Sequence, residues 1–211
     1  MNERALRQEI ALWGRSLFDR GLTSGSSGNI SARIKDGFIA TPTNSCLGFL
    51  DPQRLSKLDP QGLLVSGDAP TKELPLHLGF YHSRPEATAV VHLHSTYATA
   101  LSCLVDTPFD DAIPPITPYV VMRAGRVPLI PYTRPGSQDV YPLIAAQAGQ
   151  HSAVLLANHG PVATGATLVA AIYAIEEIEE AAKLVILTKG MKVRLLDGRA
   201  IDDLNRSFKL R

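Results

Sequence analysis

Two histidines separated by one residue give the sequence its clearest chemical signal. His92 and His94 lie in the segment VVHLHS, which is typical of a β-strand. Side chains two positions apart on a strand point to the same face, with Cα atoms about 6–7 Å apart. Both imidazoles could therefore reach one metal ion at about 2.1 Å. The alternative is a half-buried strand with ordinary polar residues on one face.

A catalytic zinc site with an open position takes three protein ligands, so another ligand must come from elsewhere in the chain. His159 is the best candidate, because it closely follows the buried strand AVLLA and lies in a tight Asn-His-Gly turn. We expect His77, His82 and His151 to be structural or surface residues, since they fall on predicted helices among polar or exposed positions.

Glu73 and Tyr119 are the candidates for proton transfer. Glu73 lies just before a predicted helix that begins at Pro75, where a glutamate ordinarily serves as a favourable first-turn charge. Beside a divalent cation, however, a carboxylate can bind the metal or move a proton. Tyr119, in ITPYVVM, has a phenolic O–H that could protonate a carbanion, although its ordinary role would be that of an amphipathic strand residue.

A further group of polar residues could hold an anion. Asn29, Thr43, Asn44, Thr71 and Lys72 lie in segments rich in glycine, proline and hydroxyl groups. Backbone amides, hydroxyls and one ammonium group can gather around a phosphate dianion. Ordinary turn chemistry explains the same residues equally well.

The elements that must position these side chains are helices and strands in alternation. The Gly- and Ser-rich run GLTSGSSGNIS reads as a functional loop rather than a linker, because it lies between a helix and a strand. This alternation predicts a layered α/β fold. The spacing of apolar residues, prolines and caps predicts helices over 6–18, 75–83, 95–104, 138–149 and 168–185, and strands over 38–43, 88–94 and 153–157.

Composition sets the protein class. The 211 residues, 45% of them hydrophobic, can bury one core, so we expect one domain over residues 1–211. The 21 basic and 20 acidic residues form no basic stretch, which makes nucleic acid and membrane surfaces poor partners. The two cysteines lack CxxC spacing and predict neither a disulfide nor a thiolate zinc site. With no signal-peptide pattern at the N-terminus, a cytoplasmic location is expected.

Taken in order, GNIS, TPTN, TKELPLH, VVHLHS, PY and ANHG resemble the class II aldolase and adducin head-domain family over nearly the whole chain. The resemblance implies a three-layer α/β/α sandwich with a largely antiparallel central sheet, assembled as a homotetramer. It implies one Zn²⁺ per subunit, bound by His92, His94 and His159, and Glu73 as an acid/base that can also approach the metal. It also implies that Tyr119 donates a proton, often into a neighbouring subunit's site.

The resemblance also concerns the substrate. It implies that the loop residues named above, Asn29, Thr43, Asn44, Thr71 and Lys72, surround a substrate phosphate. Sugar-phosphate aldolases of the family commonly have two serines before the glutamate, whereas this chain has Thr71 and Lys72. We hypothesise that Lys72 or Arg123 helps to place a substrate carboxylate or phosphate.

Longer segments indicate one branch of the family. TKELPLHLGFYHSRP, VVHLHSTYATALSCL, PYVVMRAGRVPLIPY and LLANHGPV resemble the 3-oxo-tetronate 4-phosphate decarboxylases. The implied reaction releases CO₂ and gives dihydroxyacetone phosphate through an enediolate that zinc stabilises. An aldolase of the fuculose- or rhamnulose-phosphate type and a pentulose-phosphate 4-epimerase remain alternatives, because both need the same zinc. A non-catalytic adducin-like interaction domain is a remote alternative, since such a domain should lack the histidines.

Overall fold

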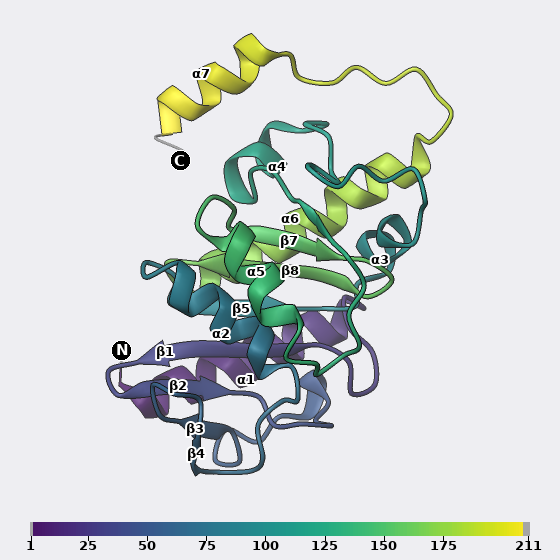
Figure 1. Cartoon of the computed structure of the whole chain (residues 1–211). Coiled ribbons are helices and arrows are strands. Elements are labelled where there is room, and N and C mark those ends of the chain that lie inside the picture. The colour runs from purple at the N-terminus through teal and green to yellow at the C-terminus, as the bar shows by residue number, and fades with distance from the viewer. Residues whose placement is uncertain (1, 209–211) are drawn as a thin grey trace.

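The computed structural model describes residues 2–208 and places one eight-stranded sheet between two layers of helices (Figure 1). The strand order is β4-β3-β2-β1-β5-β8-β7-β6, and every pairing is antiparallel except that of β6 with β7. This confirms the predicted α/β sandwich with a largely antiparallel sheet. The strands are β1 (Asn29–Ile34), β2 (Gly37–Ala40), β3 (Ser56–Leu58), β4 (Leu64–Ser66), β5 (Ala89–His92), β6 (Leu129–Ile130), β7 (Ala153–Leu156) and β8 (Gly160–Gly165).

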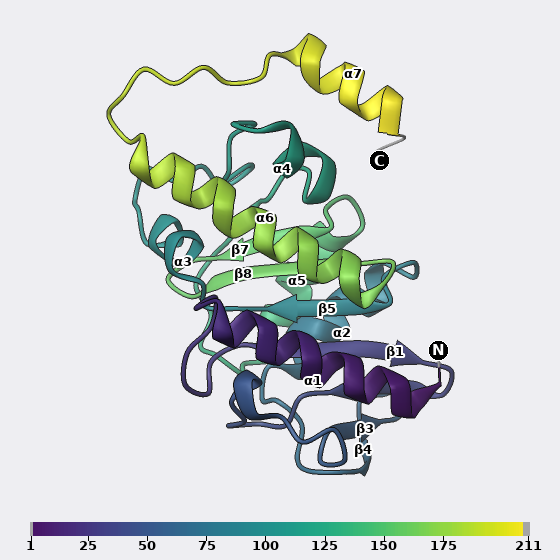
Figure 2. The same ribbon diagram turned by 180° about the vertical axis from the view of Figure 1, so that it is seen from behind.

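Two helices cover each face of the sheet. Helices α1 (Glu3–Asp19) and α6 (Leu168–Leu187) lie on one face, and α2 (Leu74–Ser83) and α5 (Val140–Ala148) on the other (Figures 1 and 2). The central strand β5 contributes side chains to the cores on both faces of the sheet, because successive side chains on a strand alternate between faces. Val91 packs into the core beneath α1 and α6, whereas Val90 packs into the core beneath α2 and α5. The sheet is therefore buried on both faces.

The remaining helices lie around this sandwich. They are the 3₁₀ helix η1 (Leu47–Phe49), α3 (Thr96–Ser102), α4 (Pro118–Arg123) and α7 (Gly198–Phe208). Helix α7 follows an extended segment after α6 and stands away from the sheet (Figure 1), and none of its residues is buried. Within residues 2–208, the structure has no helix long and apolar enough to span a bilayer.

Two local expectations about the chain were wrong. Tyr119 lies in a short helix rather than in a strand, because Thr117 caps α4 by accepting a hydrogen bond from the Val120 N–H at 3.2 Å and Pro118 occupies its first turn. Asn29 is not a loop residue. It begins β1, opposite His92 of β5, so the Gly- and Ser-rich loop ends directly at a central strand.

Candidate metal centre and substrate cavity

Several elements meet at one end of the central strands. Strand β5 ends at His92, β1 begins at Asn29, the turn between β7 and β8 carries His159, and α2 begins just after Glu73. Strand alternation points His92 to the same face as Val90, which is the face that α2 covers. The topology thus brings a strand end, a turn and a helix start together.

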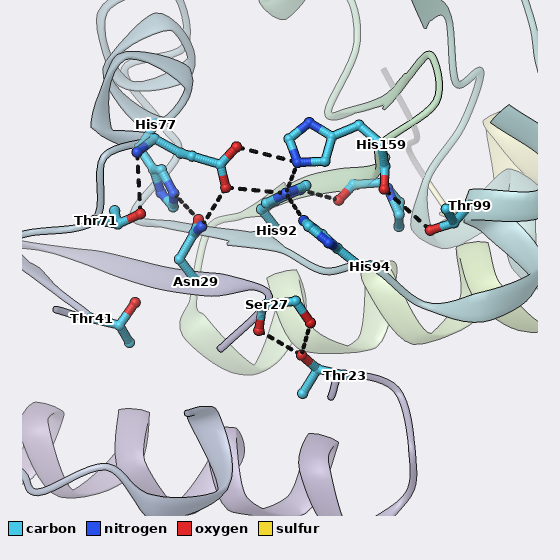
Figure 3. Close-up of polar contacts among 12 residues, drawn as sticks. Thr23, Ser27, Asn29, Thr41, Thr71, His77, His92, His94, Thr99 and His159 are labelled. Carbon is cyan, nitrogen blue, oxygen red and sulfur yellow. Dashed lines mark hydrogen bonds and ion pairs between the residues drawn. The ribbon is translucent and has the colours of Figure 1, made fainter. Parts of the chain in front are cut away.

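The predicted ligands form one cluster (Figure 3). The Nε2 atom of His92 lies 3.1 Å from that of His94 and 3.3 Å from that of His159. The Glu73 carboxylate is 3.4 Å from Nε2 of His92 and 3.3 Å from Nε2 of His159. Ligands that hold one tetrahedral zinc ion at about 2.1 Å lie about 3.4 Å from one another. The four side chains therefore fit a single divalent metal.

The protonation of the histidines also fits a metal. Nδ1 of His92 donates to the Pro161 carbonyl at 2.9 Å, so its Nε2 lone pair faces the cluster. Burial holds the pKa of His92 well below its usual value, and the neighbouring His159 and His94 lower it further. Burial also lowers the pKa of His94 and of His159. Neutral imidazoles with converging lone pairs are the form that binds metal.

His94 owes its position to the segment between β5 and α3 rather than to strand geometry, since the strand ends at His92. Glu179 of α6 fixes the start of α3, because its carboxylate accepts hydrogen bonds from the N–H groups of Tyr97 at 2.9 Å and Ala98 at 2.8 Å. Glu179 is only 5% exposed, although it lies in a run of glutamates along α6. Glu179 is therefore a buried anchor for the segment that carries His94.

The Asn-His-Gly turn shapes the approach of His159. Asn158 adopts the left-handed conformation with φ of 56°, which asparagine tolerates better than most residues. A Cβ atom at position 160 would lie 2.3 Å from the Leu93 carbonyl oxygen, so only glycine fits there. Thr99 of α3 donates to the His159 carbonyl at 3.3 Å. The turn signal in the sequence therefore had a physical basis.

A cavity of about 480 Å³ opens beside the cluster. Two of its loops lie side by side, because the Thr43 N–H donates to the Ala69 carbonyl at 2.9 Å and the Thr71 N–H donates to the Thr41 carbonyl at 3.1 Å. The structure thus brings the five predicted phosphate-loop residues together. The cavity is lined by Ser26, Ser27, Gly28, Asn29, Pro42, Thr43, Asn44, Thr71, Lys72, Glu73, His94, Thr99, Pro135, Asn158 and His159.

Lys72 brings a positive charge into this cavity. Burial is the largest cause of the lowered pKa values of His94 and His159, and the Lys72 ammonium group lowers both further. The Lys72 charge therefore acts on the end of the cavity that holds the histidine cluster.

Tyr119 and Arg123 are not brought to this cavity within the described chain. Both lie on α4, and Tyr119 is 58% exposed. The guanidinium group of Arg123 lies over the ring of Tyr173, 5.5 Å from its centroid, and lines a different cavity. Neither residue therefore lines the cavity beside the Glu73 and histidine cluster of its own chain.

One buried residue was missed by sequence reasoning. His77 was expected among polar or exposed positions, but it is fully buried. Its Nε2 atom lies 2.5 Å from the Oδ1 atom of Asn29, whose Nδ2 donates to Glu73 at 2.9 Å (Figure 3). The available signal was its position four residues after Glu73, which places His77 one helical turn beyond the residue that precedes α2.

Comparisons with known proteins give the family. The model of the "Class II Aldolase and Adducin N-terminal domain" matches residues 8–186. A 3-oxo-tetronate 4-phosphate decarboxylase of Pectobacterium atrosepticum is 50% identical over 97% of this chain and 94% of its own length. An L-fuculose phosphate aldolase of Haemophilus influenzae is 34% identical over 93% of this chain and 90% of its own.

A solved structure agrees with these relatives. YgbL from Escherichia coli superimposes with a TM-score of 0.93 and 48% identity, covering 96% of this chain and 98% of that chain. Fold, ligand cluster and sequence therefore agree, and the chain belongs to the class II aldolase and adducin N-terminal domain family.

Proposed function

We propose that this chain is a metal-dependent carboxy-lyase that converts a 3-oxo-tetronate 4-phosphate into dihydroxyacetone phosphate and CO₂. Relatives bearing that name are more similar to the chain, at up to 50% identity, than the aldolase at 34%. The structural observation that carries the proposal is the cavity itself. It joins the Glu73 and histidine cluster to Lys72 and to two hydroxyl-rich loops, which suits a substrate with an oxo group and two anionic ends.

The residues of the chain divide the work of this reaction. A divalent metal, which we propose to be zinc held by His92, His94 and His159, would supply a Lewis acid when bound. Thr43 and Thr71 offer their side-chain hydroxyl groups to the phosphate.

The bond change needs one proton. Loss of CO₂ breaks a carbon–carbon bond and leaves its electron pair on the substrate as an enediolate, and one proton added to the carbon gives dihydroxyacetone phosphate. Glu73 lies in the metal cluster and borders the cavity, where it can hold or move that proton. Aldol cleavage would leave the same kind of enediolate, so the leaving group distinguishes the two reactions.

The test measures decarboxylation and aldol cleavage in one protein preparation. It also asks whether Lys72 or Arg123 binds the anionic substrate. We expect the protein to release CO₂ from a 3-oxo-tetronate 4-phosphate, and Lys72→Ala to lower kcat/KM for this release about 10- to 100-fold, the loss of one charge-assisted contact. Lys35→Ala is the control, because Lys35 is exposed in the turn between β1 and β2. For each protein, decarboxylation is measured as CO₂ released from the 3-oxo-tetronate 4-phosphate. Aldol cleavage is measured as aldehyde released from L-fuculose 1-phosphate.

Two outcomes would contradict this assignment. Reversible aldehyde release without CO₂ would make the chain an aldolase. If Arg123→Ala lowered kcat/KM for CO₂ release and Lys72→Ala did not, the residue that contacts the substrate anion would be Arg123 on α4 and not Lys72 in the cavity wall.

We further propose that the chain forms a homotetramer in which Tyr119 donates a proton in a neighbouring subunit's site. Its exposure on α4, outside its own cavity, supports this role. Tyr119→Phe and Glu73→Gln chains should each be nearly inactive, but random co-assembly should restore about a quarter of the parent activity, because the two intact groups then meet across an interface. No gain above the separate variants would place Tyr119 in its own site or outside catalysis.

A further inference from the structure

A chain of buried polar side chains runs behind Glu73, away from the cavity. Asn29 Nδ2 donates to Glu73 Oε2 at 2.9 Å, and Asn29 Oδ1 lies 2.5 Å from His77 Nε2. His77 Nδ1 lies 2.7 Å from Ser31 Oγ, which lies 2.8 Å from the Tyr81 hydroxyl. All five residues are buried. Such a chain is costly unless every member is paired, as here.

Two elements interlock to form it. Asn29 and Ser31 are two apart on β1 and point to one face of the sheet. His77 and Tyr81 lie four apart on one face of α2, and Glu73, the residue just before the helix, lies four before His77. The polar chain therefore fixes how α2 sits on the sheet at the place where the helix begins at the metal cluster.

The hydrogen-bond directions follow from the chemistry of each group. A carboxylate accepts, so the Asn29 amide nitrogen faces Glu73 and its oxygen faces His77. An amide oxygen only accepts, so His77 carries its hydrogen on Nε2 and accepts the Ser31 hydroxyl at Nδ1. Burial lowers the pKa of His77 to about 4, although the Glu73 charge acts in the opposite direction. A neutral imidazole with one donor and one acceptor matches these directions.

We infer that His77 is a positioning residue for Glu73, acting through the Asn29 amide. Its Nε2–H holds the amide so that an N–H group, and not the oxygen, faces the carboxylate. This keeps Glu73 Oε2 fixed and leaves Oε1 beside His159, 3.3 Å from its Nε2 atom. The inference rests on the proposed function, in which Glu73 moves the proton. His77 touches neither the reacting atoms nor the cavity.

The first test uses a matched pair of variants. Glutamine and methionine have similar length and volume, but only glutamine can donate to Asn29. We expect kcat for CO₂ release to be about 30-fold lower in His77→Met than in His77→Gln, as for a lost hydrogen bond to a site that serves a charged group. In an Asn29→Ala background the difference should shrink below about twofold, because the path to Glu73 is then already broken.

The inference fails if kcat falls equally in His77→Met and His77→Gln, or if their difference in kcat persists in the Asn29→Ala background. Either result would leave His77 with a packing role only. Metal content and thermal midpoint, measured for each variant, show whether it is folded and loaded.

A second test needs no variant and no reaction. In ¹⁵N-labelled parent protein, the ring nitrogens of His77 should show hydrogen on Nε2 and none on Nδ1, and the reverse tautomer would overturn the inference. A parent that releases no CO₂ but shows this tautomer would refute the proposed function and leave the hydrogen-bond chain intact. The two failures are therefore distinguishable.

Discussion

Replacing His94 by alanine is expected to remove the metal and to lower kcat/KM for CO₂ release by at least about 10³-fold, since a Lewis-acid metal supplies several kcal/mol of transition-state stabilisation. His94 is the best ligand to remove, because it lies at the exposed rim of the cluster and its loss leaves the core intact. Replacing His92 would be harder to interpret, because His92 is fully buried and its loss would create a packing defect as well as remove a ligand.

The measurement is zinc content per chain together with the rate of CO₂ release. His94→Ala should hold less than about a tenth of the parent's metal, because losing even an outer-shell partner of a zinc ligand costs about 10- to 100-fold in affinity, and losing a ligand costs at least as much. His82→Ala is the matched control, since His82 is also exposed but lies on α2 and bonds Tyr141. A His94→Ala protein with full metal and near-parent activity would contradict the ligand assignment.

Replacing Glu73 by glutamine is expected to lower kcat about 10²- to 10⁴-fold while the metal stays bound, because a positioned acid/base contributes on that scale. Glutamine keeps the shape of the side chain, and its oxygen can still accept the Asn29 N–H that now bonds Oε2. It cannot take up or release a proton near neutral pH. The change therefore separates proton transfer from metal binding.

Metal content is the deciding control in this experiment. The three histidines remain in Glu73→Gln, so we expect about one metal ion per chain. Glu180→Gln, at an exposed position on α6, should behave like the parent. If kcat fell less than about tenfold in protein with its full metal content, Glu73 would not be the acid/base. If kcat fell in proportion to the metal content, Glu73 would be only a metal ligand.

The sequence predicted which residues meet in the Glu73 and histidine cluster better than it predicted how they are held. His92 and His94 converge as the HxH spacing predicted, yet only His92 belongs to β5. His94 is placed by α3, whose start depends on Glu179, 81 residues after Ala98 in the chain. Such a long-range contact leaves no mark in local spacing, so the sequence alone does not identify Glu179 as the residue that holds the start of α3.

His77 and Asn29 show the same limit. Helix α2 packs against both the sheet and its neighbour α5, so it has few exposed positions and no simple polar face. The pairing of β1 with β5, which sets Asn29 opposite His92, is equally invisible in one segment. By contrast, turn residues act locally, and the Asn-His-Gly turn and the helix start near Pro75 were predictable.

The most direct test of the account is CO₂ release by metal-free protein as zinc is added back. With a 3-oxo-tetronate 4-phosphate as substrate, we expect no release at first, then a rate that rises until about one zinc per chain, with one dihydroxyacetone phosphate formed for each CO₂. Release that is independent of the metal, or fully loaded protein that releases no CO₂ from either enantiomer of this substrate, would contradict a metal-dependent carboxy-lyase at this site.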